Sequence, residues 1–289
     1  GPGLLVRGYS RRRWAMSEWN SNPGSTAGGW EANADRVDER LQPVTDWLID
    51  RAEIHAGDTV LDLAAGPGGV GHAAARLVGS NGRVLSTDLA PAMVDAARRI
   101  GARRGLTNVE YRVIDAQAMD LDDDLVDVAV CRSGFMLMPN PIEALRETRR
   151  VLRPEGNLAF SVFGAPEQNP FVHVPVAVLV ELGYLPPPQP GTPGVFAMSD
   201  TVRIETALLE SGFDVTAIEA IDLAGSFPDA EFVVNRIFEM NPQVSDVHQR
   251  LDRDGQEEAR RAMMAGFATF RQVDGTYVLP SQMWGVHAR

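Results

Sequence analysis

The chain has 289 residues, of which 44% are hydrophobic and 23% are charged, and its formal net charge is −12. The length allows one large α/β domain with an inserted lid, which we expect here, or two modest domains, and the composition is that of a globular protein with a sizeable core. The acidic balance leaves no broad basic surface to neutralise phosphates, so we expect no nucleic-acid partner. All 27 basic residues are arginines, which excludes Schiff-base lysine chemistry and a P-loop.

Cysteine content and hydropathy indicate a cytoplasmic protein without a membrane span. Cys131 is the single cysteine, which excludes an internal disulfide and a multi-cysteine metal site. The start of the chain has no apolar stretch that is typical of a signal peptide. The most apolar run, 172–182, contains Pro175 and Glu181 and is shorter than the roughly 20 residues that a span needs.

The first half of the chain alternates short apolar runs with helical patterns. Residues 1–29 show no sustained period and are expected to be a flexible segment, and 30–53 predict one or two amphipathic helices. We expect strands over 59–64, 83–88, 109–114, 126–131 and 157–163, and helices over 70–78, from Pro91, and over 141–152. Arg153-Pro154-Glu155-Gly156 is interpreted as a stop signal after the last helix. This alternation predicts a Rossmann-like, doubly wound, mostly parallel α/β sheet, with ligands beyond the carboxyl ends of the strands.

Two interruptions in the second half predict a helical lid. Residues 165–199 are rich in proline, and 228–240 and 245–270 have helical patterns, whereas a helix over 200–211 and strands over 213–221 and 282–287 continue the core. The predicted division is a flexible segment (1–29), a cofactor-binding core (30–165), a proline-rich lid insertion (166–199), a core continuation (200–222), a helical lid insertion (223–274) and a last core strand (275–289).

The segment VLDLAAGPGGVG, residues 60–71, carries the sharpest functional signal. Gly66, Gly68 and Gly71 satisfy the pattern G-x-G-x-x-G, in which glycines allow a tight turn and close approach of a ligand to the backbone. Asp62 precedes this turn, and its carboxylate would repel a pyrophosphate but attract the amino group of a methionine moiety. Asp88 follows at about the 20-residue offset at which an acid meets ribose hydroxyls.

Four blocks together resemble the UbiE-like family of class I S-adenosylmethionine-dependent methyltransferases over residues 55–165. The blocks are VLDLAAGPGGVG, TDLAPAMVDAAR, VIDAQAMDL and the long run from DVAVCRSGF to NLAFSVFG. Ala64 stands at the first glycine position of the family motif. The resemblance implies S-adenosylmethionine as the cofactor and the following binding residues: Asp62, Ala64, Gly66, Gly68, Asp88, Leu89, Asp115, Ala116 and Cys131. It also implies that the Trp30 ring covers the bound cofactor, with packing in the core or the lid as the alternative.

Other readings of these residues stay open. A nicotinamide-dependent (NAD(P)) oxidoreductase could use the same glycine turn, although Asp62, Asp115 and the absence of a Tyr-x-x-x-Lys pair count against it. A non-catalytic homologue that binds the cofactor is a third reading. The run Asp122-Asp123-Asp124 is interpreted as a solvated loop, and the five scattered histidines have no metal-ligand spacing, so we expect no metal site.

The expected reaction is methyl transfer to an oxygen, nitrogen or carbon atom of a small molecule, in secondary or in lipid- or quinone-like metabolism. His173 in the lid is the candidate general base, with a structural role as its alternative. Apolar residues of the lid suggest a partly hydrophobic acceptor; they are Phe171, Val174, Phe196, Phe232, Phe238 and Met240. Packing in a hydrophobic core explains some of these residues equally well. The acceptor itself and the oligomeric state stay open, with a homodimer as one possible assembly.

Overall fold

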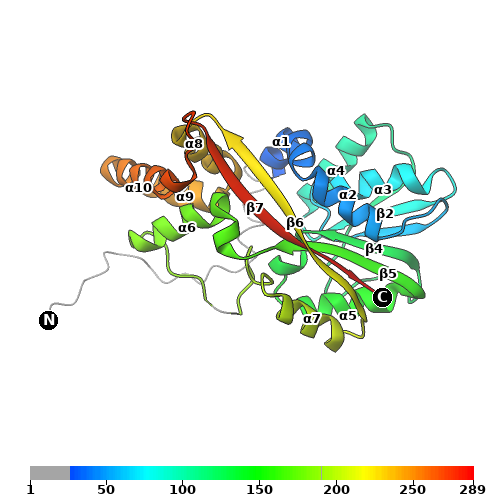
Figure 1. Ribbon diagram of the computed structural model, residues 1–289. Coiled ribbons are helices and arrows are strands. Elements are labelled where there is room, and N and C mark those ends of the chain that lie inside the picture. Colours follow the sequence, from blue (N-terminus) through cyan, green and yellow to red (C-terminus); the bar gives the residue numbers. More distant parts are fainter. Residues whose placement is uncertain (1–26, 190) are drawn as a thin grey trace.

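The fold is described by a computed structural model over residues 27–189 and 191–289. Its seven strands form a single sheet with the order β3-β2-β1-β4-β5-β7-β6 (Figure 1). The strands are β1 (Thr59–Asp62), β2 (Arg83–Asp88), β3 (Val109–Val113), β4 (Val126–Arg132), β5 (Leu152–Phe163), β6 (Val215–Phe227) and β7 (Tyr277–Ala288).

The first five strands are parallel, β7 pairs antiparallel with β5, and β6 at the edge pairs antiparallel with β7. The strand order reverses between β1 and β4, which lie side by side although β2 and β3 separate them in the sequence. Open α/β sheets bind their ligands at such a switch point, outside the carboxyl ends of the strands. The predicted Rossmann-like, mostly parallel fold is confirmed.

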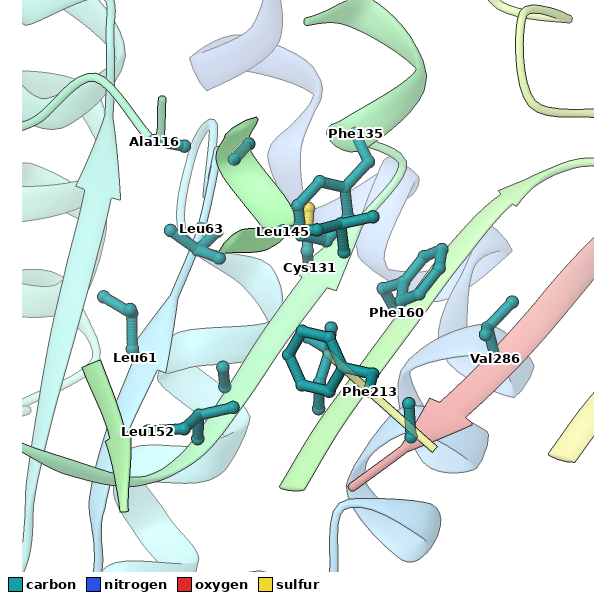
Figure 2. Close-up of a cluster of buried hydrophobic side chains, with 14 of the residues drawn as sticks. Leu61, Leu63, Ala116, Cys131, Phe135, Leu145, Leu152, Phe160, Phe213 and Val286 are labelled. Atoms are coloured by element: carbon teal, nitrogen blue, oxygen red, sulfur yellow. The ribbon is translucent and has the colours of Figure 1, made fainter. Parts of the chain in front are cut away.

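Helices cover both faces of this sheet. They are α1 (Ala27–Arg40), α2 (Gln42–Arg51), α3 (Gly69–Val78), α4 (Pro91–Arg103), α5 (Pro141–Val151), α6 (Pro170–Glu181), α7 (Thr201–Glu210), α8 (Ala230–Met240), α9 (Pro242–Arg250) and α10 (Arg253–Gly266). Neighbouring residues of β5 pack into different apolar cores on the two faces of the sheet, because side chains alternate along a strand. Ala159 packs with apolar residues of α2 and α3, whereas Phe160 packs with those of α5 and α7 (Figure 2).

Two element boundaries differ from the sequence prediction. Helix α1 already begins at Ala27, so 27–29 are helical, and residues 1–26 lie outside the described part. The segment 153–156, which we predicted to be a stop between a helix and a strand, is instead part of β5. Leu152 pairs with Val126 and Asn157 with Val128, so the sheet absorbs the extra residues as an irregularity.

Strands β6 and β7 are much longer than predicted. They pair from Val215 and Ala288 to Phe227 and Tyr277 and form a ribbon that extends beyond the other strands (Figure 1). The far part of β6 was missed because it is half-solvated and its exposed side chains, those of Asp222, Ala224 and Ser226, are small or polar. Cross-strand pairing to β7 holds it in place, which a local pattern does not reveal.

Helices α6, α8, α9 and α10 gather around the far end of this ribbon (Figure 1). They share a third apolar core, which includes Leu179 of α6, Val233 of α8 and Met263 of α10. Helix α6 corresponds to the apolar run of the proline-rich insertion and accommodates Pro175. These helices fit the expected lid, and the division of the chain into core and lid stays a prediction. Within residues 27–189 and 191–289, no helix combines the length and apolarity that crossing a membrane requires.

Candidate functional site

Three acidic side chains come from the ends of three neighbouring parallel strands. Asp62 is the last residue of β1 and Asp88 the last residue of β2, while Asp115 follows β3 by two residues. Because β1, β2 and β3 are adjacent and parallel, these ends meet at the same edge of the sheet. The structure therefore brings together the acids that the sequence had linked only by spacing.

The turn between β1 and α3 depends on left-handed backbone conformations. Gly66 and Gly68 have φ angles of 54° and 89°, and Ala64 has a φ of 49°. Such a conformation costs a residue with a Cβ about 1–2 kcal/mol, so Ala64 holds strain at this turn. A Cβ placed on Gly66 would meet no atom within 4 Å, which leaves its backbone open to a ligand.

Asp62 is a buried carboxylate held against the first turn of α3. Its Oδ2 accepts a hydrogen bond of 2.7 Å from the backbone N–H of Gly71. A Cβ at Gly71 would lie 2.6 Å from the same oxygen, so this position requires glycine. Burial raises the pKa of Asp62 to about 7, against the opposing effects of the Gly71 hydrogen bond and the Arg132 charge. A cationic ligand would stabilise the ionised form of such a carboxylate.

The carboxylate of Asp88 is fixed by the backbone on both sides. Oδ2 accepts from Gly66 N–H and Oδ1 from Ala90 N–H, each at 2.9 Å. Burial raises the pKa of Asp88 above its ordinary value. Each oxygen keeps a second acceptor position, so the group can still receive hydrogen bonds from two hydroxyls. At Asp115, Oδ1 accepts hydrogen bonds from the backbone and side-chain nitrogens of Gln117, and within residues 27–189 and 191–289 its Oδ2 has no side-chain hydrogen bond.

The remaining predicted cofactor residues differ in their surroundings. The side chains of Cys131 and Ala116 belong to the apolar core that contains Phe135 and Leu145 (Figure 2). Burial raises the pKa of the Cys131 thiol to about 12, so it is a neutral packing group. Leu89 is 44% exposed, and Trp30 is half-buried on α1. Cofactor contacts of these four residues stay predictions.

An ion-pair network that the sequence did not suggest closes one side of the site. Arg132, the last residue of β4, donates from Nη2 to Asp38 on α1 at 3.0 Å and from Nη1 to Thr45 on α2 at 2.8 Å. Asp38 also receives a hydrogen bond of 3.0 Å from Arg104. The one available signal was a charged residue that ends the apolar strand VDVAVCR, as Asp62 ends β1.

The Asp38 carboxylate lies at the first residue of α3. A Cβ on Gly69 would collide with Asp38 Oδ1, which shows how close this acid comes to the helix N-terminus. In dinucleotide sites the pyrophosphate occupies this end of the helix. An acid at that place disfavours a second anion, which weakens the NAD(P) reading.

His173 lies on α6 beside aromatic residues near the same edge of the sheet. Its ring is 6.2 Å from that of Phe196, which in turn contacts Phe163 at the end of β5 at 6.3 Å. The imidazole is half-buried. Through Phe196, His173 is thus linked to the end of β5, and its catalytic role stays a prediction.

The carboxylate acceptors at this edge suit a ligand that carries a positive charge and hydroxyl groups. Asp62 offers a carboxylate for an ammonium group, Asp88 offers two acceptors for ribose hydroxyls, and the open backbone at Gly66 allows close approach. S-adenosylmethionine carries such groups. The residues at the carboxyl edge therefore fit this cofactor.

Comparisons with known proteins agree with this geometry. A family model described as a methyltransferase domain matches residues 54–176. The chain is 30% identical to the ubiquinone/menaquinone biosynthesis C-methyltransferase UbiE of Hydrogenovibrio crunogenus, covering 57% of this chain and 69% of that protein. It is 32% identical to the aklanonic acid methyltransferase DauC of Streptomyces sp. strain C5, covering 50% of this chain and 69% of the relative. Some other curated relatives are matched over only about half of their length.

A solved structure shares the fold. The SAM-dependent methyltransferase from Aquifex aeolicus matches with a TM-score of 0.50 at 21% identity, covering 65% of this chain and 90% of the other. The two curated relatives share 30% identity or more across two thirds of their length. The chain therefore belongs to the UbiE-like class I family of S-adenosylmethionine-dependent methyltransferases.

Proposed function

We propose that the protein transfers a methyl group from S-adenosylmethionine to a small-molecule acceptor. The observation that carries the proposal is the pair of strand-end carboxylates on either side of the glycine turn, buried Asp62 and half-buried Asp88. When bound, the cofactor supplies an electrophilic methyl group on its sulfonium.

The protein's own residues bind and orient the reactants. Asp62 would hold the ammonium group, Asp88 would hold the ribose hydroxyls, and Asp115 with the Ala116 backbone would bind the adenine. Helix α1, which carries Trp30, covers the site from the side at which Asp38 meets α3. Methyl transfer is an in-line displacement, so aligning the nucleophile and excluding water are the main tasks.

The acceptor is proposed to be partly hydrophobic, as in secondary or lipid- and quinone-like metabolism, with an oxygen, nitrogen or carbon atom as nucleophile. Support comes from the aromatic residues around His173, namely Phe163 and Phe196. The names of the two relatives, a quinone C-methyltransferase and an aklanonic acid methyltransferase, point in the same direction. Two of the other apolar lid residues, Phe171 and Phe238, pack into the apolar core that α6, α8, α9 and α10 share, so they do not by themselves indicate an acceptor.

His173 is proposed as the general base that removes the acceptor's proton. Replacement by alanine is expected to reduce turnover of an acceptor found by screening while leaving cofactor affinity unchanged, since the ring lies on α6 and not at the glycine turn. Steady-state kinetics and calorimetry on the same preparations measure both quantities. Unchanged turnover would return His173 to a structural role.

Calorimetric titration tests the proposal as a whole. The full chain is titrated with S-adenosylmethionine and S-adenosylhomocysteine, and with NADH and NADPH as controls. Micromolar binding of the sulfur compounds alone is expected. Binding of a nicotinamide cofactor alone would overturn the proposal, and cofactor binding without a product from any acceptor would favour a non-catalytic homologue.

A further inference from the structure

Two polar side chains enclose the peptide that opens α3. A Cβ on Gly68 would lie 2.7 Å from Cε1 of His72, and a Cβ on Gly69 would collide with Asp38 Oδ1. Because these two side chains lie directly against the glycine turn, the position of the Gly68–Gly69 peptide depends on where His72 and Asp38 are held.

Hydrogen bonds at both ring nitrogens hold the fully buried imidazole of His72. Its Nδ1 lies 3.3 Å from Nη1 of Arg104, and its Nε2 lies 3.0 Å from the hydroxyl of Tyr111. Burial and the charge of Arg104 lower the pKa of His72 to about 4, so the ring is neutral near neutral pH. A guanidinium can only donate, so Nδ1 accepts from Arg104 and Nε2 donates to Tyr111. The two contacts together fix the orientation of the ring against Gly68.

The guanidinium of Arg104 also holds the second side chain. Its Nη2 donates to Asp38 Oδ2 at 3.0 Å and to Asp35 Oδ1 at 2.7 Å. The Arg104 side chain is 20% exposed, and its planar fork presents donors in fixed directions. One group, which follows α4, thus joins the two side chains that enclose the Gly68–Gly69 peptide.

This peptide leads into the turn of α3 against which Asp62 is held. The N–H of Gly71, two residues after Gly69, donates to Asp62 Oδ2 at 2.7 Å. A shift of the turn would move the donor that fixes Asp62, whereas the proposed ribose end of the site is built on Asp88 of β2. The contacts of Arg104 therefore bear most on the end of the site that is proposed to hold the ammonium group.

We propose that Arg104 is a positioning residue for the methionine end of the cofactor site. By holding His72 and Asp38 in place, it fixes the Gly68–Gly69 peptide and the first turn of α3, which carries the donor to Asp62. The inference rests on the proposed methyltransferase function and deepens it, because it names a residue behind the glycine turn on which cofactor affinity depends.

Two ligands that share an adenosine moiety test the assignment. S-adenosylhomocysteine carries an amino-acid group that 5′-methylthioadenosine lacks, and both are titrated into the full chain by calorimetry, well below the melting temperature of each variant. We expect Arg104→Met to weaken S-adenosylhomocysteine binding about tenfold, the effect of losing roughly one hydrogen bond to a charged group. The affinity for 5′-methylthioadenosine should change less than twofold, because this ligand has no ammonium group for Asp62. A purely structural role predicts equal losses for the two ligands.

Arg103→Met is the matched control. Arg103 is the last residue of α4, its side chain is 60% exposed, and it pairs with Glu31 of α1 at 3.2 Å. The substitution removes the same charge and an ion pair to α1, but it leaves the contacts of His72 and Asp38 in place. Both affinities should stay as in the wild type.

His72→Leu tests the same link in a chain that keeps Arg104. It removes the acceptor of Nη1, and it should again weaken S-adenosylhomocysteine binding while sparing that of 5′-methylthioadenosine. Because the arginine acts partly through this ring, the free-energy losses of the two single variants should not add in the double variant.

The assignment would be overturned by equal losses for the two ligands, by an unchanged affinity of Arg104→Met for S-adenosylhomocysteine, or by additive effects in the double variant. Failure of S-adenosylhomocysteine to bind the wild-type chain would instead contradict the proposed function. The two failures are distinguishable because the first is a difference between variants and the second is seen in the wild type alone.

Discussion

Asp88 shows at the scale of one residue how the fold prepares a carboxylate for a ligand. Two backbone N–H groups, of Gly66 and Ala90, hold its oxygens in place. Asp88→Ala is expected to weaken S-adenosylhomocysteine binding at least about tenfold, because hydrogen bonds to a charged group contribute roughly 1.5–3 kcal/mol each. Calorimetry measures the change.

Asp95→Ala is the control for this substitution, since Asp95 is an exposed acid on α4. It should leave the affinity unchanged. A change of less than twofold for Asp88→Ala would remove the ribose assignment.

The raised pKa of Asp62 predicts how cofactor binding depends on pH. Its carboxyl has a pKa of about 7 without ligand, so it is mostly protonated at pH 5.5 and mostly ionised above pH 7.5. Affinity for S-adenosylhomocysteine should therefore rise about tenfold or more between these values, because only the ionised form attracts the ammonium group. Titrations across this range test it, and Asp62→Asn should flatten the profile. A wild-type profile as flat as that of the variant would contradict the role of Asp62.

The same group affects stability in the opposite direction. Its pKa is raised from an ordinary value of 3.8 to about 7, so between about pH 4 and 7 the folded protein holds a proton that the unfolded chain has lost. The contribution of Asp62 to the stability of the ligand-free protein is thus complete below pH 4 and is lost as the pH rises through 7.

At the scale of elements, α1 is attached to the sheet by charged contacts as well as by apolar packing. Asp38 joins α1 to Arg132 of β4 and to Arg104, which follows α4. Glu31 near the start of α1 pairs with Arg99 and Arg103 of α4, and these arginines lower the pKa of Glu31 to about 2. Because these pairs join α1 to both β4 and the end of α4, they determine where the helix lies over the site.

Two neighbouring acids of α1 allow this attachment to be tested. Asp38→Ala is expected to cost about 2 kcal/mol, because it leaves Arg132, whose side chain is 9% exposed, without its carboxylate. Asp35→Ala removes the same charge from a side chain that is 92% exposed and should have almost no effect. Urea denaturation measures both free energies of unfolding. Equal effects of the two substitutions would show that the buried pair does not hold α1.

At the scale of the whole molecule, cofactor binding should be visible as thermal stabilisation. A ligand at one hundred times its dissociation constant adds about 2.7 kcal/mol to the folded state. For a chain of this size, S-adenosylhomocysteine should therefore raise Tm by about 5 °C, as measured by calorimetric or fluorescence melts. NADH at the same concentration serves as the control and should leave Tm unchanged. A Tm that S-adenosylhomocysteine does not move would contradict cofactor binding to the folded chain.

The sequence by itself determined the architecture of the parallel half and the positions of the acids at its edge. Alternating periods of two and 3.6 residues are local properties, so β2 and the start of α4 at Pro91 were predicted at their observed positions. Asp62 and Asp88 were found because a charged residue at the end of an apolar strand is itself a local signal.

Tertiary structure alone decided the long β6–β7 ribbon and the Asp38–Arg132 pair. Each depends on residues far apart in the chain: Phe227 pairs with Tyr277, and Asp38 meets Arg132. Such pairings are stabilised by burial and by charge attraction after the chain has folded. No local period records them, and so the ribbon and the ion-pair network became visible only in three dimensions.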